Sequence, residues 1–593
     1  MPEKRNRAVE RLRPLVTLAP SPPRMRPAVK AALTVFLCLG IGTLFGRQDL
    51  GLLCVTGTFA VLYAPTAPLR RRFATVAGIG LGLVGSTTLG AFTAGSTILF
   101  AATAVLLAMT TAGLCLALRV GPPGSYFLVL CAGIAHYLAG AHGTSPALIS
   151  GMTAVGAAVA VLVTMVELVP DPRRPERLAV GAAVRATRAY ADSTPGPDSR
   201  ALHRTAAQSL ATAEEAVAEG HWRPDPALMA QLTTARSEYD RRARRATEYF
   251  LPTEDLSWDP RNPDAGRWVD QEEEPTDIDM PSASAAERAG HALAENERRH
   301  VGSLRRRLSD GLRYPGEPWS VALSVGLATT VSILLLVLVL GGDQTHLYWV
   351  IAFSALVLHQ GGPRVVRTYR AVHRLIGTVA GLGLFLVVSF LQPTGWWIVA
   401  LIVGLQFTIE LLVTRNYSLA VALITPLALT VATGGRYADE PWALVGERFL
   451  DTVIGVLVAL IVLWAVGRRA HHRAVRGDTR RVLREVAEYA RGDEQSPAEP
   501  TLASALRDLH SATALLSADG HRDSPEARTA EALIHAGYLM LGAHDRRTLA
   551  ASAQPWTELA ALELPTGRRP VGQSHPVDVQ IRDESQRMGA TLD

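Results

Sequence analysis

Long apolar runs constrain this chain more than any other feature of its sequence. Runs of mostly apolar residues recur at 28–46, 101–118, 147–169, 319–340 and 449–465. A helix needs about 20 such residues to cross a bilayer core about 30 Å thick. With 48% hydrophobic and 19% charged residues, the chain is too apolar for an ordinary soluble protein and too polar to consist of spans alone. We therefore expect a multi-pass membrane protein that also has soluble parts.

Two sets of six apolar segments are predicted. The segments of the first set are 28–46, 50–64, 74–93, 97–118, 126–141 and 147–169. Those of the second set are 319–340, 347–359, 372–391, 395–413, 417–433 and 448–467. The second segment of each set is short for a span, which indicates local thinning, tilt or a partly re-entrant helix.

Four landmarks recur at one spacing in the two sets. The pairs, each 299 residues apart, are Arg71 and Arg370, Gly78 and Gly377, Gly82 and Gly381, and Gly156 and Gly455. Ser125-Tyr126, which opens the fifth segment, matches Asn416-Tyr417 at a shifted spacing of 291 residues. This recurrence predicts an internal repeat. Because six spans is an even number, both copies begin on the same side of the membrane and are parallel.

The expected fold class is an all-α membrane protein with two six-span helical bundles in parallel repeat, each followed by a cytoplasmic helical module. The predicted parts are a basic N-terminus (1–27), the first bundle (28–169), a helical domain with an acidic linker (170–316), the second bundle (317–467), a C-terminal helical domain (468–560) and a disordered tail (561–593). With twelve spans, most basic loops fall on one side. By the positive-inside rule this side is the cytoplasm, which places both termini and both modules inside an inner or plasma membrane.

A basic stripe precedes or enters the third span of each set. Its residues are Arg364, Arg367, Arg370 and Arg374 in the second set, and Arg70, Arg71 and Arg72 in the first. At about 100° per residue, three of the second-set arginines share one helix face. Two interpretations are open. In one, the stripes only fix topology and anchor at lipid phosphates; in the other, they line an aqueous funnel that collects carboxylates.

Ionisable residues inside apolar segments are costly unless they find a partner or water, so each is a candidate functional residue. In the second set these residues are Glu410, Arg448 and Asp451. Arg448 and Asp451 are one helical turn apart, so they either satisfy each other as a buried ion pair or serve a proton or substrate role.

Small residues and one proline mark expected helix contacts. Gly78, Gly82, Gly377 and Gly381 are predicted to let neighbouring helices approach closely. Pro426 is predicted to break the fifth span of the second set and to free backbone groups along a substrate path. A kink without function is the alternative.

Enzyme and cofactor signatures are missing from the sequence. Lysine occurs only at Lys4 and Lys30, so there is no P-loop GK[ST]. There is also no H-E-x-x-H and no paired CxxC. We therefore expect no catalytic residues, no cofactor and no metal. The four cysteines lie in apolar segments and are expected to be packing residues.

Three stretches carry a family resemblance. They are YWVIAFSALVLHQGGPRVVRTYRAVHRLIGTVAG (348–381), NYSLAVALITPLAL (416–429) and ERFLDTVIGVLVAL (447–460). With them the chain resembles the FUSC family, which includes fusaric acid resistance proteins and aromatic acid exporters, with plant aluminium-activated malate transporters as more distant relatives. The NY, TP and R-x-x-D elements are missing from the first half. The residues that match motif positions are Arg367, Arg370, Arg374, Asn416, Tyr417, Arg448 and Asp451.

The resemblance implies an inner-membrane protein that moves organic anions, in bacteria usually outward. We expect a secondary active efflux transporter for aromatic or other small organic carboxylates, with the basic stripes, Asn416 and Tyr417 along the anion path. A passive organic-anion channel and a membrane-anchored scaffold, whose cytoplasmic helices bind a partner, are the alternatives. The expected partners are a small organic anion and the lipid bilayer, without nucleic acid; a homo-oligomer is left open.

Overall fold

The secondary-structure elements in the computed structural model of this chain are all helices within the residues that it describes. These are residues 24–193, 197–221, 223, 225–247, 308, 312, 316–340, 344–435, 441–466, 470–491, 498–521, 524–542, 553–561, 580–584 and 587. The chain divides into two compact units, each described here by itself. Unit 1 comprises Met1–Pro172, Leu304–Ala474 and Ala518–Gly520, and unit 2 comprises Arg173–Ser303, Val475–Ser517 and His521–Asp593.

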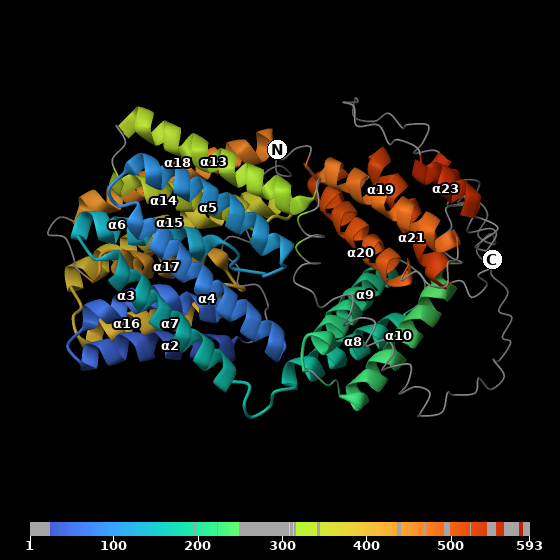
Figure 1. The fold of residues 1–593 in the computed structure, drawn as a ribbon, viewed down its shortest axis with the longest axis horizontal. Coiled ribbons are helices and arrows are strands. Elements are labelled where there is room, and N and C mark those ends of the chain that lie inside the picture. The colour runs from blue at the N-terminus through green and yellow to red at the C-terminus, as the bar shows by residue number, and fades with distance from the viewer. Residues whose placement is uncertain are drawn as a thin grey trace, which may run out of the picture. The chain divides into compact units, whose positions relative to one another are not determined.

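Unit 1 contains the apolar helices of both halves, which run alongside one another in Figure 1. The helices of the first half are α2 (Met25–Leu44), α3 (Gln48–Thr58) with the short 3-10 helix η1 (Phe59–Leu62), α4 (Leu69–Phe92), α5 (Thr97–Ala117), α6 (Tyr126–His142) and α7 (Pro146–Val166). Those of the second half are α13 (Glu317–Leu340), α14 (Gln344–Leu358), α15 (Arg364–Leu391), α16 (Trp396–Leu412), α17 (Tyr417–Ala432) and α18 (Pro441–Ala465).

Seven of these helices are long and apolar enough to cross a membrane: α2, α4, α5, α7, α13, α15 and α18. The other apolar helices, at Gln48–Leu62, Tyr126–His142, Tyr348–Leu358, Trp396–Leu412 and Tyr417–Ala432, are shorter. The helix positions agree with the predicted segments, including the short second member of each set. The start of α15 differs, because the helix begins at Arg364 rather than near residue 372. Arginine is a good helix former, so the basic stripe, which was expected on one helix face, forms the first turns of this helix.

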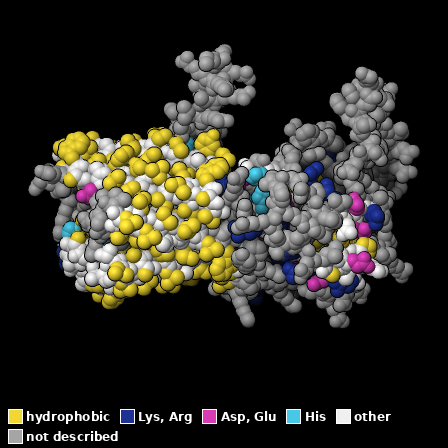
Figure 2. All heavy atoms as spheres, turned by 90° about the horizontal axis from the view of Figure 1, so that it is seen from above, with side chains coloured by type: hydrophobic (Ala, Val, Ile, Leu, Met, Phe, Trp, Pro, Cys, Tyr) yellow, Lys and Arg dark blue, Asp and Glu magenta, His cyan; other side chains and the backbone are white. Residues whose placement is uncertain are grey.

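The apolar surface of unit 1 fits a lipid environment. Large apolar side chains point outward along several helices; Ile98 is 84% exposed and Leu338 is 82% exposed. In Figure 2, hydrophobic side chains cover most of the visible face of this unit. An exposed apolar surface of this extent is stable only against lipid or another apolar partner.

The two halves pack against each other instead of standing apart as two bundles. Helix α2 of the first half packs on α16 of the second, and α13 packs on α5 in the same way. Within each half, α4 packs on α6 and α15 on α17, while α3 packs on α7 and α14 on α18. The expectation of two six-span bundles is therefore replaced by one unit in which helices of both halves interleave.

Close helix contacts confirm the packing role of most predicted glycines. A Cβ added at Gly381 would lie 2.7 Å from the Ala422 carbonyl oxygen, and one at Gly377 would lie 2.8 Å from Val421 Cβ. At Gly82 the added atom would lie 3.0 Å from a methyl group of Leu128. The prediction for Gly78 is wrong, since nothing lies within 4 Å of a Cβ added there. Gly78 is exposed on the outer face of α4.

Helix α17 continues through Pro426, so the predicted break at this residue is wrong. Proline has no backbone N–H, which leaves the carbonyl of Ala422, four residues earlier, without its usual helix donor. That carbonyl faces Gly381 of α15, as the close approach above shows. The Thr425 hydroxyl donates to Val421 O at 3.0 Å. Helix α17 thus keeps its proline without unwinding where it packs closely on Gly381 of α15.

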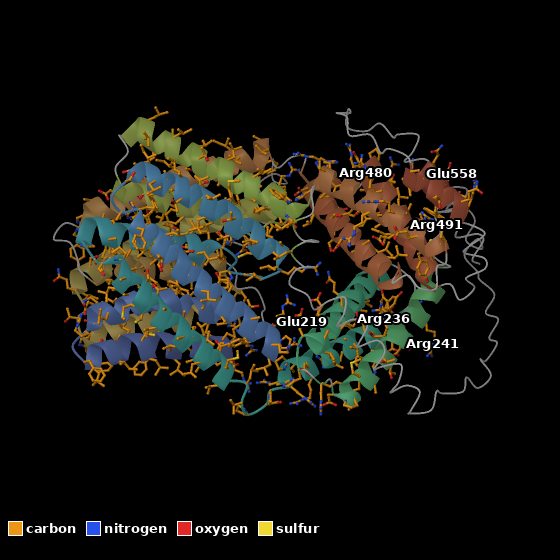
Figure 3. All side chains as sticks on the ribbon, in the orientation of Figure 1. Glu219, Arg236, Arg241, Arg480, Arg491 and Glu558 are labelled. Atoms are coloured by element: carbon orange, nitrogen blue, oxygen red, sulfur yellow. The ribbon has the colours of Figure 1, made fainter. Side chains whose placement is uncertain are left out.

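Unit 2 is built from amphipathic helices of both soluble segments. They are α8 (Arg174–Ala191), α9 (Pro197–Ala218), α10 (Pro226–Thr247), α19 (Ala470–Arg491, whose first residues belong to unit 1), α20 (Ala498–Leu516), α21 (Pro525–Gly542) and α23 (Ala553–Ala561). The two predicted modules thus belong to one compact unit. Ion pairs tie neighbouring helices together: Arg236 of α10 (Figure 3) donates to Glu214 of α9 at 2.6 Å.

Some expectations fall on residues outside the described ranges. These are most of the basic N-terminus (1–27), the acidic linker and most of the tail (561–593). Within the tail, residues 580–584 are helical and Ile581 is fully buried. This differs from the disorder expected there, because an apolar side chain of the tail finds a place in a core.

Candidate functional site

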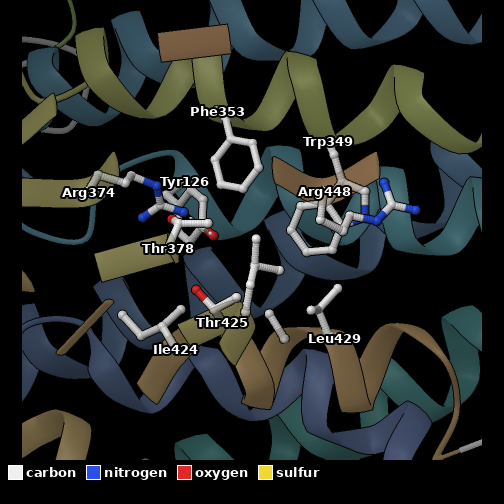
Figure 4. A pocket seen from close by; sticks show the side chains of 11 residues that line it. Tyr126, Trp349, Phe353, Arg374, Thr378, Ile424, Thr425, Leu429 and Arg448 are labelled. Atoms are coloured by element: carbon white, nitrogen blue, oxygen red, sulfur yellow. Dashed lines mark hydrogen bonds between the residues drawn. The ribbon is translucent and has the colours of Figure 1, made fainter. Parts of the chain in front are cut away.

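A narrow pocket inside unit 1 is the candidate site, and Figure 4 shows it from close by. It is formed by α6 of the first half together with α14, α15, α17 and α18 of the second. The lining residues are Tyr126, Trp349, Phe353, Arg374, Thr378, Leu382, Ile424, Thr425, Ala428, Leu429 and Arg448. In this conformation it has free space for no more than about one water molecule. The pocket thus combines two guanidinium groups and three aromatic rings with apolar side chains.

Arg374 is buried in this pocket without an acidic partner. Its guanidinium donates to the hydroxyl of Tyr126 at 3.2 Å and to that of Tyr417 at 3.4 Å. It also lies over the rings of Tyr126 and Phe353, 5.2 and 5.0 Å from their centres. Only 4% of the residue is exposed. Among the described residues, no carboxylate lies within ion-pair distance of it, and its Nε has no hydrogen-bond partner.

Arg448 is the second cation of the pocket, and it has a carboxylate partner. Its Nη1 donates to Oδ2 of Asp451 at 2.8 Å, and Asp451 is fully buried. The guanidinium also lies over the rings of Tyr348 and Trp349, at 5.5 and 5.3 Å. This geometry favours the ion-pair interpretation of Arg448 and Asp451; a proton or substrate role stays a prediction.

Helix geometry explains how the sequence places these groups. Arg374 and Thr378 are one turn apart on α15 and therefore point the same way. The Thr378 hydroxyl is buried and has no hydrogen-bond partner. Tyr126 and Tyr417 are each the first residue of their helix. Just before Tyr417, the Asn416 side chain accepts from the backbone N–H of Leu419 at 3.2 Å, so Asn416 caps the helix that Tyr417 opens.

The remaining arginines of the α15 stripe have different surroundings. Arg367 is buried, while Arg370 is exposed. Arg364 binds Asp519: its backbone N–H and its Nε donate to the two carboxylate oxygens at 2.7 and 2.8 Å. Both residues belong to unit 1. The structure therefore brings only Arg374 of the predicted stripe into the pocket.

The first-half stripe lies in another cluster. Arg72 is buried and donates to Glu167 at 3.0 Å, and Lys30 donates to the same oxygen at 3.1 Å. Arg72 also donates to the backbone oxygens of Pro65 and Ala67. Arg70 and Arg71 are half-buried. A place for these three arginines on the anion path stays a prediction.

Glu410 lies at the end of α16 and is buried. Arg24, just before α2, forms an ion pair with it at 3.2 Å. Glu410 does not line the pocket. The position of Glu410 therefore gives no support to its predicted role in coupling. Its contact with Arg24 is explained as an ion pair that joins the start of α2 to the end of α16.

Sequence reasoning missed the aromatic wall of the pocket. Trp349 and Phe353 come from α14 and stack on each other, with ring centres 5.6 Å apart. Their spacing of four residues in an apolar segment was the available signal, but it is the signal of any packed helix. Tyr126 was noticed only as the match of Tyr417. Among the described residues, no group of three or more His, Cys, Asp or Glu gathers as metal ligands would.

The pKa of Asp519 offers a test of its contact with Arg364 at the start of α15. Burial opposes ionisation of its carboxyl group, but hydrogen bonds from His471, at 2.7 Å, and from Arg364 outweigh burial and lower its pKa from 3.8 to about 2. A lowered folded-state pKa stabilises the protein by ~2 kcal/mol above about pH 4, and the gain is lost as pH falls towards 2.

We expect Asp519→Asn to unfold at a lower temperature than the unchanged protein at pH 7. The two melting curves should converge as the pH is lowered towards 2. Differential scanning fluorimetry of the detergent-solubilised proteins measures this difference. A constant difference across the pH range would contradict the ionised contact.

Comparison with known proteins supports the resemblance found in the motifs. Residues 327–462 match the family model described as "Fusaric acid resistance protein-like". Over 137 residues the chain is 31% identical to "Uncharacterized membrane protein YvaC" of Bacillus subtilis (strain 168). That match covers 23% of this chain and 22% of the relative, so the chain spans about a fifth of the relative's length. No solved structure matches the chain.

Proposed function

From the family match over residues 327–462, we propose that this multi-span membrane protein exports small organic anions, with an aromatic carboxylate as the favoured cargo. The observation that carries the proposal is Arg374, a buried cation without a described acidic partner in a pocket lined by aromatic rings. We propose that this export is secondary active. Termini and soluble helices on the cytoplasmic side follow from the basic loops.

The energetics of Arg374 favour an anionic ligand. A charge held away from water is costly unless it is paired, and the two tyrosine hydroxyls supply only neutral acceptors. A carboxylate can accept from the unpartnered Nε of Arg374 and from the Thr378 hydroxyl. The ring of an aromatic acid can then lie against Phe353 and Trp349. The pocket thus offers a partner to each part of such a ligand.

We also propose that the two sets of helices are copies of one six-helix repeat. The interlocked contacts of α2 with α16 and of α13 with α5 support this. So do two glycine contacts: Gly156 packs against Cys54 of α3, and Gly455 packs against Phe353 of α14, which lies 299 residues after Cys54. Arg374 bonds both helix-opening tyrosines, one from each copy, so the site lies at the junction of the copies.

The pocket is too narrow for a ring as it stands, so transport requires the helices to move apart. Movement of the two interlocked copies can open the junction to one side of the membrane at a time. A secondary active carrier fits this closed pocket. A passive channel would need a continuous opening, and a scaffold would need no buried cation at all.

Flux through the purified protein tests the proposal. Proteoliposomes loaded at pH 8 with benzoate, benzamide or benzylamine should release only benzoate faster than protein-free liposomes do. Equal release of all three, or no protein-dependent release, would contradict anion transport and favour the scaffold. If an imposed proton gradient drives benzoate accumulation and a protonophore stops it, the protein is a coupled carrier; flux that survives the protonophore indicates a channel.

A further inference from the structure

The two arginines of the pocket differ in whether a carboxylate of the protein balances their charge. They lie towards opposite ends of the pocket in Figure 4. Both line it, whereas Asp451 does not. Oδ2 of Asp451 lies 2.8 Å from Nη1 of Arg448, and Asp451 is fully buried. One guanidinium is thus balanced by a carboxylate of the protein, and the other is not.

We infer that the pocket accepts a single negative charge and that Asp451 sets this limit, so that monoanionic carboxylates are selected over dicarboxylates. The inference rests on the proposed function and narrows its substrate class. Asp451 acts as a specificity-determining residue, because it neutralises the second arginine without touching the ligand.

Charge balance in a site away from water is the physical reason. Arg374, Arg448 and Asp451 together carry one net positive charge, which a monocarboxylate cancels. A dicarboxylate that spans the pocket brings its second group to Arg448, where Asp451 already binds. One negative charge would then remain uncompensated away from water, which is strongly unfavourable. Two guanidinium groups at opposite ends would otherwise suit a dicarboxylate well.

The wall of the pocket between the two arginines determines what kind of body the ligand has beyond its carboxylate. It consists of the Trp349 and Phe353 rings on one side and the apolar part of α17 on the other, including Ile424 and Leu429. An uncharged aromatic or apolar body fits between these surfaces. The expected substrate therefore has one carboxylate at one end and no charge at the other.

Two ligands of similar shape test the inference on the unchanged protein. Monomethyl terephthalate carries one charge at pH 8 and terephthalate carries two. Each competes with radiolabelled benzoate for the purified protein, and the monoester should bind at least 10-fold more tightly. Equal binding, or tighter binding of the dianion, would overturn the inference while leaving anion transport intact. Absence of benzoate binding would instead reject the proposed function.

Variants of Arg448 and Asp451 test whether Asp451 causes the preference for a single negative charge. Asp451→Asn removes the negative charge bound to Arg448 and should raise the affinity for terephthalate relative to the monoester at least 10-fold. The double variant Arg448→Gln/Asp451→Asn restores one net positive charge and should return the ratio to its original value. Asp49→Asn, which removes an exposed carboxylate that pairs with Arg47 outside the pocket, is the matched control. An Asp451→Asn protein that binds benzoate with an unchanged ratio would overturn the role of Asp451.

Discussion

Replacing Arg374 by Gln should reduce carboxylate export at least 100-fold and leave the protein folded. The guanidinium is the uncompensated cation of the pocket, and hydrogen bonds to a charged group contribute about 1.5–3 kcal/mol each. Losing two of them corresponds to roughly a 100-fold loss of affinity or more. Folding should survive, because replacing a buried charge by a neutral group of similar size is often tolerated.

Arg370→Gln is the matched control for this experiment. Arg370 is one turn from Arg374 on α15 but is exposed, so its neutralisation should change benzoate release from proteoliposomes less than threefold. Size-exclusion chromatography of both variants verifies folding. Full transport by a folded Arg374→Gln protein would contradict the assignment of the anion site.

Replacing Gly156 by Leu should prevent stable folding. Gly156 lies on α7, where an added Cβ would collide with the backbone oxygen of Cys54 on α3. A leucine would force the two helices apart, and overpacking of this kind costs about 1–3 kcal/mol or more. The loss of the close helix contact adds to this cost. We expect little or no monodisperse protein after extraction into detergent.

Gly151→Leu, on the same helix, is the control because nothing lies within 4 Å of a Cβ added at Gly151. Its yield and melting temperature should match those of the unchanged protein. If both variants are equally stable, α3 and α7 are not packed as closely as the structure indicates. If both are equally unstable, the effect comes from leucine and not from the contact.

The helix positions were predictable because hydrocarbon thickness imposes a length on apolar segments. The short second helices, α3 and α14, were predicted as apolar segments that fall below this length. The start of α15 was missed because an apolar run indicates only the part of a helix that lies in lipid. The Arg-rich turns from Arg364 onward belong to the same helix. They are not an apolar run, so a search for apolar runs does not include them.

The candidate site was predictable in part. The predicted stripe on α15 contains Arg374. The turn spacing of Arg448 and Asp451 left an ion pair and a proton or substrate role open, and the structure has the two side chains in contact. Sequence position could not separate Arg374 from Arg370, since both lie within one turn and burial decides between them. Nor could it bring Tyr126 to Arg374, because that contact joins residues 248 positions apart. Such a contact depends on how the two halves interlock.

The most direct test of the central claim is a structure of the protein determined with 4-iodobenzoate, located by the anomalous scattering of iodine. The account predicts an iodine peak between α14 and α17, with the carboxylate within hydrogen-bond distance of the Arg374 guanidinium. A peak elsewhere at saturating ligand, with the pocket around Arg374 still closed, would contradict it.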